Sequence, residues 1–100
     1  MIDPNKVGGF DWDSGNDRKS QHKHDVSMAE AEQVFFNTPL LIVADANHSQ
    51  KEPRFHALGM TDEKRAMHIT FTLRKSGQLI RVISARDMHR KERVIYDEAN

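Results

Sequence analysis

The clearest pattern in the chain is the alternation of apolar and polar residues from His68 to Arg74. A period of two predicts a β-strand with one buried face and one polar face. Turn residues follow at 75–78 and lead into an apolar-rich stretch from Leu79 to Ala85, so this region predicts a β-hairpin. Two earlier stretches, Leu40 to Ala44 and Arg54 to Leu58, predict the strands that precede it.

The strongest helical pattern begins after Ser27, which forms a Ser-x-x-Glu capping box with Glu30. Apolar residues then recur at helical spacing, which predicts a helix from Met28 to about Phe36. Pro39 ends this helix, because proline disfavours helical geometry in the residue before it.

Two further helices have weaker support in the sequence. The polar stretch from Ser14 to His24 can form a helix only if the rest of the protein packs on it. Asp87 is a residue type that caps helices, and it predicts a last helix ending at Tyr96.

This order of elements predicts an α+β fold with a small antiparallel four-stranded sheet, two N-terminal helices and one C-terminal helix. Residues 1–9 contain Pro4 and two glycines and are expected to form a flexible N-terminal arm. A chain of 100 residues accommodates one domain, which we place at residues 10–100.

Composition narrows the class of protein. Hydrophobic residues make up 37% of the chain and charged residues 30%, as in folded globular proteins. The chain has no cysteine, which excludes disulfides, thiolate nucleophiles and cysteine-ligated zinc. No apolar run is long enough for a membrane span or a secretory signal, so we expect a cytoplasmic protein.

The charge is unevenly distributed although the formal net charge is zero. Residues 1–50 contain 4 Lys and Arg against 8 Asp and Glu, whereas residues 51–100 contain 11 against 7. A net basic second half permits phosphate binding, but a neutral whole gives little long-range attraction for nucleic acids.

The adjacent Lys23 and His24 are candidates for proton transfer and phosphate contact. Histidine exchanges a proton near neutral pH, and a neighbouring cation lowers its pKa. The alternative is an exposed helix end, where Lys and His commonly complement the helix dipole.

Four arginines fall on or beside the predicted strands: Arg54, Arg74, Arg81 and Arg86. Guanidinium groups on one sheet face bind a phosphodiester and stabilise the charge of its transition state. Regular alternation puts Arg81 and Arg86 on opposite faces unless the strand ends or bulges between them. The alternative is that the arginines pair with acidic neighbours, namely Glu52, Asp87 and Glu92.

Trp12 and Tyr96 are candidates for stacking on RNA bases, with anchoring of the core as the alternative. The chain contains six histidines, of which His22 and His24 are two positions apart. No His-x-x-x-His pattern or acidic partner pattern for a metal site accompanies them, so we expect no metal site.

A set of residues with matching order and spacing resembles the BrnT family of type II toxins. These residues are Trp12-Asp13, Lys23-His24, Val26, Ala31, Arg54-Phe55, Gly59, Arg81-Val82-Ile83-Ser84-Ala85-Arg86, Glu92-Arg93 and Tyr96. The resemblance covers nearly the whole chain from Phe10 to Tyr96. It implies a RelE-like ribonuclease fold and a toxin that inhibits growth by cleaving RNA without a metal or other cofactor.

The resemblance also implies roles for residues and a partner. In such an enzyme the ribose 2′-hydroxyl attacks the adjacent phosphate, which requires proton transfer and cations for the developing charge. Lys23 and His24 are the first candidates for proton transfer. The candidates for binding phosphate are Arg54, Arg81 and Arg86, and those for other substrate contacts are Trp12, Arg74 and Tyr96. The implied partner is a BrnA-like ribbon-helix-helix antitoxin, which binds operator DNA and connects the toxin to it only indirectly.

Three positions near the expected site depart from the family pattern. The family usually has Lys at Asn16, Asn at Ser20 and Gly at Asp25. These changes remove a cation, shorten a polar side chain and add a carboxylate next to His24. They leave open an alternative function, a catalytically weakened toxin that acts mainly as an antitoxin-binding corepressor.

Overall fold

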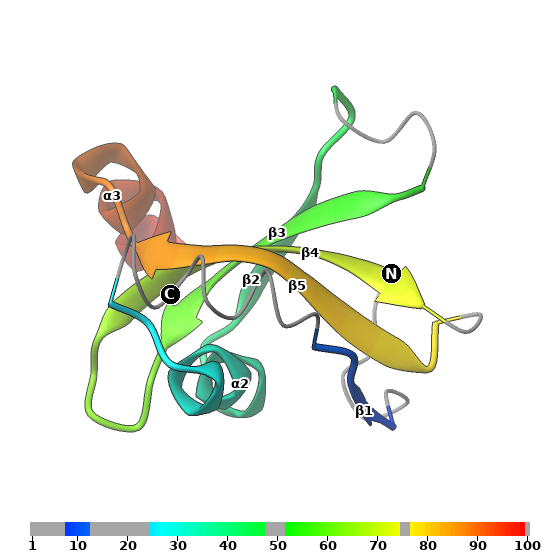
Figure 1. The fold of residues 1–100 in the computed structure, drawn as a ribbon. Coiled ribbons are helices and arrows are strands. Elements are labelled where there is room, and N and C mark those ends of the chain that lie inside the picture. The colour runs from blue at the N-terminus through cyan, green and yellow to red at the C-terminus, as the bar shows by residue number, and fades with distance from the viewer. Residues whose placement is uncertain (1–7, 13–24, 48–51, 75–76, 100) are drawn as a thin grey trace.

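The computed structural model describes residues 8–12, 25–47, 52–74 and 77–99. Within these ranges the chain forms five strands and two helices (Figure 1). In chain order they are β1 (Gly9–Phe10), α2 (Met28–Phe36), β2 (Leu41–Ala44), β3 (Arg54–Met60), β4 (Ala66–Arg74), β5 (Leu79–Asp87) and α3 (Arg90–Glu98).

The five strands form one mixed sheet in the order β1-β5-β4-β3-β2. The antiparallel meander from β2 to β5 is as predicted, but a purely antiparallel four-stranded sheet was wrong, because β1 adds a parallel edge strand beside β5. Gly8 N–H donates to the Gln78 carbonyl, and Asp11 N–H donates to the Ile80 carbonyl. The alternation of Phe10, Asp11 and Trp12 suggests a short first strand, and the structure has it at Gly9–Phe10, where the Phe10 ring packs on Phe35 at 5.6 Å between centroids.

Helix α2 begins as its sequence predicts. Ser27 is the N-cap, its hydroxyl accepts from Glu30 N–H, and the Glu30 carboxylate accepts from Ser27 N–H. The predicted helix at residues 14–24 lies outside the described residues, so the described part of the chain has two helices instead of the three expected.

The predicted start of the last helix was wrong. Asp87 is the final residue of β5, opposite Met67, and its carboxylate accepts from the Arg65 guanidinium. Helix α3 begins after His89, whose N–H donates to Glu92. A cross-strand pair and an ion pair therefore hold Asp87 in the sheet, and the Glu92 carboxylate satisfies the helix N-terminus instead.

The core lies between α2 and one face of the sheet. Its fully or nearly fully buried members are Val26, Ala31, Val34, Phe35, Ala57, Met67, Ile69, Phe71, Ile80, Val82 and Ala85. A Cβ atom on Gly59 would lie 2.8 Å from Val34 Cγ1, so the close approach of α2 to β3 requires glycine there.

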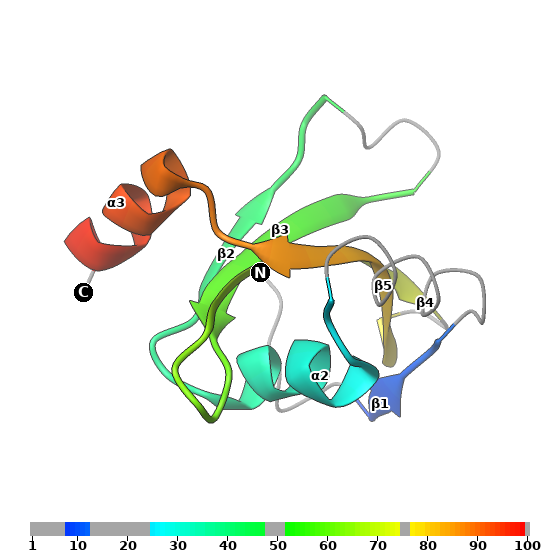
Figure 2. The same ribbon diagram turned by 60° about the vertical axis from the view of Figure 1, so that its left-hand side comes forward.

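Helix α3 lies beyond the end of β5 and extends away from the sheet (Figure 2). Tyr96 is its buried residue, and the Tyr96 hydroxyl donates to the Pro39 carbonyl at 2.6 Å. None of the helices in the described part of the chain is long and apolar enough to cross a membrane.

Candidate active site on the polar face of the sheet

The sheet face opposite α2 carries three rows of residues across β3, β4 and β5, all polar except Leu58. Side chains of directly paired residues point to the same side of a sheet, so the strand register defines each row. The rows are Arg54, Thr72 and Arg81; His56, Thr70 and Ser84; and Leu58, His68 and Arg86. We call these nine residues the polar face. Its middle row has a histidine and two hydroxyls, and an arginine-containing row lies on each side.

A β-bulge in β5 makes this arrangement possible. Thr70 pairs with Ser84 while the next residue, Phe71, pairs with Val82, so the register shifts by one residue and Ile83 is the extra residue. A bulge changes which later side chains point to each face. Arg81 and Arg86 therefore lie on the same face, which regular alternation would have prevented.

His56 lies in the middle row of the polar face, on β3, and has a partner at each ring nitrogen. His56 Nε2 lies 2.9 Å from Asp45 Oδ2, and Nδ1 lies 3.1 Å from Thr70 Oγ1. The Asp45 side chain is only 10% exposed, and its other oxygen accepts from Asn47 N–H. The carboxylate is thus fixed by two contacts and orients the imidazole.

His68 lies beside His56 but is almost fully buried. The two rings are 4.8 Å apart between centroids, and His68 is 8% exposed. Burial, reinforced by the nearby Arg86 charge, lowers the pKa of His68 to about 4, so the ring is neutral at physiological pH. Its Nδ1 atom has no hydrogen-bond partner among the described residues.

Arg86 is held by Glu92 of α3 through two hydrogen bonds of 2.8 Å. This pairing, together with the His89 N–H bond, lowers the pKa of Glu92 to about 2. Arg74, the last residue of β4, places its Nη1 atom 3.3 Å from Oε2 of Glu52, which lies just before β3. The acidic-pairing alternative therefore describes Arg74 and Arg86, and the guanidinium of Arg86 is committed to a structural ion pair.

Arg54 and Arg81 flank the fully buried Thr72, whose hydroxyl donates to the Pro53 carbonyl. Neighbouring strands are about 4.8 Å apart, so these two arginines start about 10 Å from each other. Residues two positions apart along a strand are separated by about 7 Å, which an arginine side chain spans. Both side chains are therefore long enough to reach the space over the His56 row, where two guanidinium groups would stabilise a phosphate from two sides.

The two candidate aromatic residues are placed differently. Trp12 packs against the core cluster, and its indole N–H donates to Glu32 at 2.7 Å. Tyr96 is 2% exposed and fastens α3 to the turn at Pro39. This burial of Tyr96 leaves no ring face for a base and favours the core-anchor alternative.

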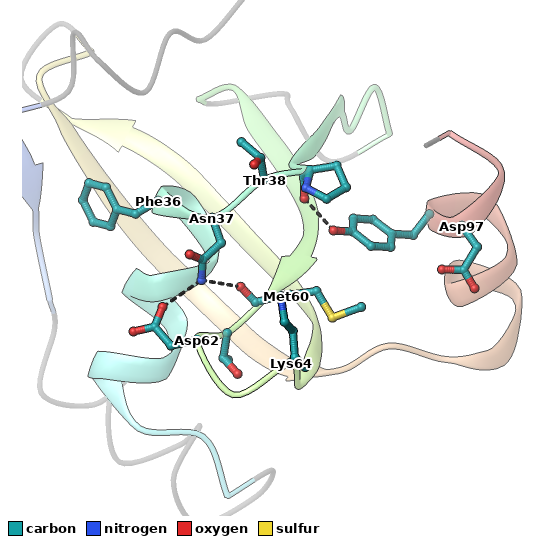
Figure 3. Close-up of a pocket in the computed structure, with 10 residues that line it drawn as sticks. Phe36, Asn37, Thr38, Met60, Asp62, Lys64 and Asp97 are labelled. Atoms are coloured by element: carbon teal, nitrogen blue, oxygen red, sulfur yellow. Dashed lines mark hydrogen bonds between the residues drawn. The ribbon is translucent and has the colours of Figure 1, made fainter.

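A pocket of about 380 Å³ offers a second candidate site, at the end of the sheet between α2, the β3–β4 turn and α3 (Figure 3). Its lining residues are Phe36, Asn37, Thr38, Pro39, Met60, Thr61, Asp62, Lys64, Tyr96 and Asp97. The Asn37 amide is already bound to the Met60 carbonyl and to Asp62. With two carboxylates, one ammonium and no imidazole, this pocket suits neither an RNA phosphate nor acid–base chemistry.

A family model matches residues 12–92 of the chain. The family is BrnT, which consists of ribonuclease toxins of type II toxin-antitoxin systems. The chain belongs to the BrnT family. A BrnT protein is a ribonuclease toxin, and membership of a type II system implies an RNA substrate and an antitoxin partner. No match was found among curated proteins.

The family motif Lys23-His24 lies outside the described residues, as do Asn16 and Ser20, so their places relative to the polar face are untested. Asp25 is described and has a positive φ of 54°. Only a few per cent of non-glycine residues adopt such a conformation, and Asp is among those enriched there. The glycine usual in BrnT chains at this position is therefore explained by backbone geometry.

Arg65 secures the chain directly after the BrnT Lys-His motif. Its guanidinium donates to the Asp25 carbonyl at 2.8 Å, to Glu30 at 2.9 Å and to Asp87. These contacts tie the start of α2 to the end of β5. The segment that follows His24 is thus anchored at the edge of the sheet that carries Arg86.

Sequence reasoning missed three residues of the candidate BrnT site: Asp45, His56 and Thr70. Alternation in β4 places Thr70 on the polar face, but nothing local shows that His56 is its cross-strand neighbour. Across the described residues, no three His, Asp or Glu side chains gather closely enough to hold a metal ion.

Proposed function

We propose that the polar face is the site at which this BrnT toxin cleaves RNA, without a metal, by attack of a ribose 2′-hydroxyl on the adjacent phosphate. The observation that carries the proposal is the bulged register of β5, which aligns Arg81 with Arg54 on the face that also carries His56 and Thr70. Cations stabilise the transition state, while a histidine and hydroxyls lie in the neighbouring row.

The arginines divide into two roles in this proposal. Arg54 and Arg81 bind the scissile phosphate, since their side chains are long enough to extend over the neighbouring His56 row. Arg86 shapes the site through Glu92, because both of its terminal nitrogens bind that carboxylate. Lys23 and His24 stay in the proposal as proton-transfer and phosphate-contact candidates on the strength of the family motif.

Family membership supports the following proposal for the biological setting. The toxin degrades RNA in the cytoplasm and stops translation and growth. A BrnA-like ribbon-helix-helix antitoxin neutralises it and brings the pair to operator DNA. The alternative is a weakened toxin that serves as corepressor, and it keeps its support at Asp25, because the positive φ there explains why glycine suits the position but leaves the added carboxylate next to His24.

The test uses chain made by cell-free synthesis and a structured RNA in buffer containing EDTA. The parent is expected to cleave the RNA and leave 2′,3′-cyclic phosphate and 5′-hydroxyl ends. Arg81→Ala and Arg54→Ala are each expected to lower the rate about 100-fold, as removal of a transition-state donor does. Arg90→Ala, which removes an exposed arginine at the start of α3, is the matched control and should not change the rate.

Two results would contradict the proposal. Cleavage that stops in EDTA and returns with a divalent cation would rule out the metal-independent reaction. A folded parent that neither cleaves RNA nor slows growth, yet binds its antitoxin, would make the corepressor the function of this chain.

A further inference from the structure

Asp45, His56 and Thr70 form a hydrogen-bonded chain at the polar face, and none of them is among the residues that carry the BrnT resemblance. The three come from separate segments: the turn after β2, strand β3 and strand β4. The two links, carboxylate to imidazole and imidazole to hydroxyl, measure 2.9 Å and 3.1 Å. A carboxylate, an imidazole and a hydroxyl in this order form the arrangement that activates a hydroxyl for proton transfer.

The direction of the hydrogen bonds follows from the chemistry of the groups. An ionised carboxylate only accepts, so the proton of the neutral imidazole lies on Nε2 and points to Asp45. His56 Nδ1 then has a free lone pair and accepts from the Thr70 hydroxyl. The oxygen of Thr70 keeps lone pairs with which it can accept a hydrogen bond from a bound ligand.

The position of Thr70 also fits a role in the reaction. It lies between His56 and Ser84 in the middle row, directly at the β-bulge, and bulges often aim a side chain at an active site. Thr70 is half-buried and the His56 side chain is 32% exposed, so both side chains are partly accessible from one face of the sheet.

We propose that Thr70 contacts the ribose 2′-hydroxyl and relays its proton to His56, with Asp45 as the positioning residue that fixes the imidazole. This inference rests on the proposed function, since it assigns the proton acceptor of that same site.

The step balances as an internal transesterification. The 2′-oxygen passes its proton to Thr70 Oγ1 as Thr70 passes its own to His56 Nδ1, and the bond from the 2′-oxygen to phosphorus forms. The bond from phosphorus to the 5′-oxygen breaks, and that oxygen takes a proton from water. The imidazolium, stabilised by Asp45, then returns its proton to solvent, so the products are a 2′,3′-cyclic phosphate and a 5′-hydroxyl.

The charged and titratable groups around His56 are compatible with its accepting a proton. Asp45 contacts it from the end of β2, the His68 ring packs beside it at a tilt from β4, and Glu92 of α3 binds Arg86 and lies near His68. Arg54 shares its strand, and Arg81 and Arg86 approach from β5. Because buried His68 is neutral at physiological pH, it adds no positive charge beside a protonated His56.

The test measures the pH–rate profile of RNA cleavage in parent, His56→Gln, Thr70→Val and Thr70→Ser chains. The parent rate should rise with pH, because only a neutral imidazole can accept a proton. His56→Gln should lose this rise and fall about 100-fold at pH 7.5. Thr70→Val should fall equally, whereas Thr70→Ser, which keeps the hydroxyl, should stay within tenfold of the parent.

Matched controls separate chemistry from folding and binding. His89→Gln removes an exposed histidine at the start of α3 and should leave the profile unchanged. Each variant should melt cooperatively and bind 2′-O-methyl RNA, which cannot be cleaved, within about twofold of the parent.

The outcomes distinguish this proposal from the one on which it rests. If the parent cleaves and Arg81→Ala is slow, but Thr70→Val is as fast as the parent, the relay is wrong and the site stands. The relay is also wrong if His56→Gln keeps the pH dependence. A parent that does not cleave RNA would overturn both proposals.

Discussion

The two faces of one sheet serve different purposes, and strand β4 shows this most clearly. On the face toward α2 its residues Met67, Ile69 and Phe71 are fully buried in the core. On the other face, Thr70 and His68 meet a histidine, an arginine and a carboxylate from three other elements. Neighbouring residues of β4 thus lie in different environments, one in the apolar core and the next among polar side chains. Substitutions on the first face should change stability, and those on the second should change activity.

Phe71→Ala should cause the largest loss of stability, because it removes a ring from the buried face of the sheet. The Phe71 ring packs 5.1 Å from that of Phe35 and 5.5 Å from that of Phe55, and the residue is fully buried. Loss of a buried aromatic ring costs about 3–5 kcal/mol of unfolding free energy. Urea unfolding measures this cost. Val43→Ala, at a half-exposed site opposite His56, is the control and should cost under about 0.5 kcal/mol.

Acid should destabilise the protein through the polar face. The pKa of His68 is about 4 when folded against 6.5 when unfolded, so between these values the unfolded chain binds more protons. Its contribution is present above pH 6.5 and is lost as the pH falls to 4, by up to about 3 kcal/mol. Glu92, whose pKa is lowered from 4.5 to about 2, continues the loss below pH 4.5.

The measurement is urea unfolding at pH 7, 5.5 and 4 for the parent and for His68→Gln, which cannot titrate. The variant should lose much less stability than the parent between pH 7 and pH 4. An equal loss in both chains would show that His68 is not the group responsible, and His89→Gln should behave as the parent.

Much of the fold could be predicted because its patterns are local. The capping box at Ser27 set the start of α2, and alternation set β4 and its hairpin with β5. The parallel pairing of strand β1 with β5 could not be predicted, because it joins two residues to a distant strand and depends on packing of the Phe10 ring. The start of α3 was misplaced because Asp87 bonds to Arg65 instead of capping the helix.

The candidate site was only partly predictable, for a related physical reason. The sequence shows the arginines of the strands, and the acidic-pairing alternative anticipated the bonds from Arg74 to Glu52 and from Arg86 to Glu92. Strand register and the bulge decide the remainder, since they join His56 to Thr70 and bring Arg81 to the same face as Arg86. Both depend on how strands pair, which residue spacing along one strand does not reveal.

The most direct test of the account is to map where uncleavable RNA binds. Isotope-labelled chain titrated with 2′-O-methyl RNA should show its largest NMR shift changes on the polar face, at Arg54, His56, Thr70 and Arg81. Residues around Asn37 and Lys64, which line the pocket at the end of the sheet, should change little. Changes concentrated at that pocket, with the polar face unaffected, would contradict the assignment of the polar face as the site of RNA cleavage.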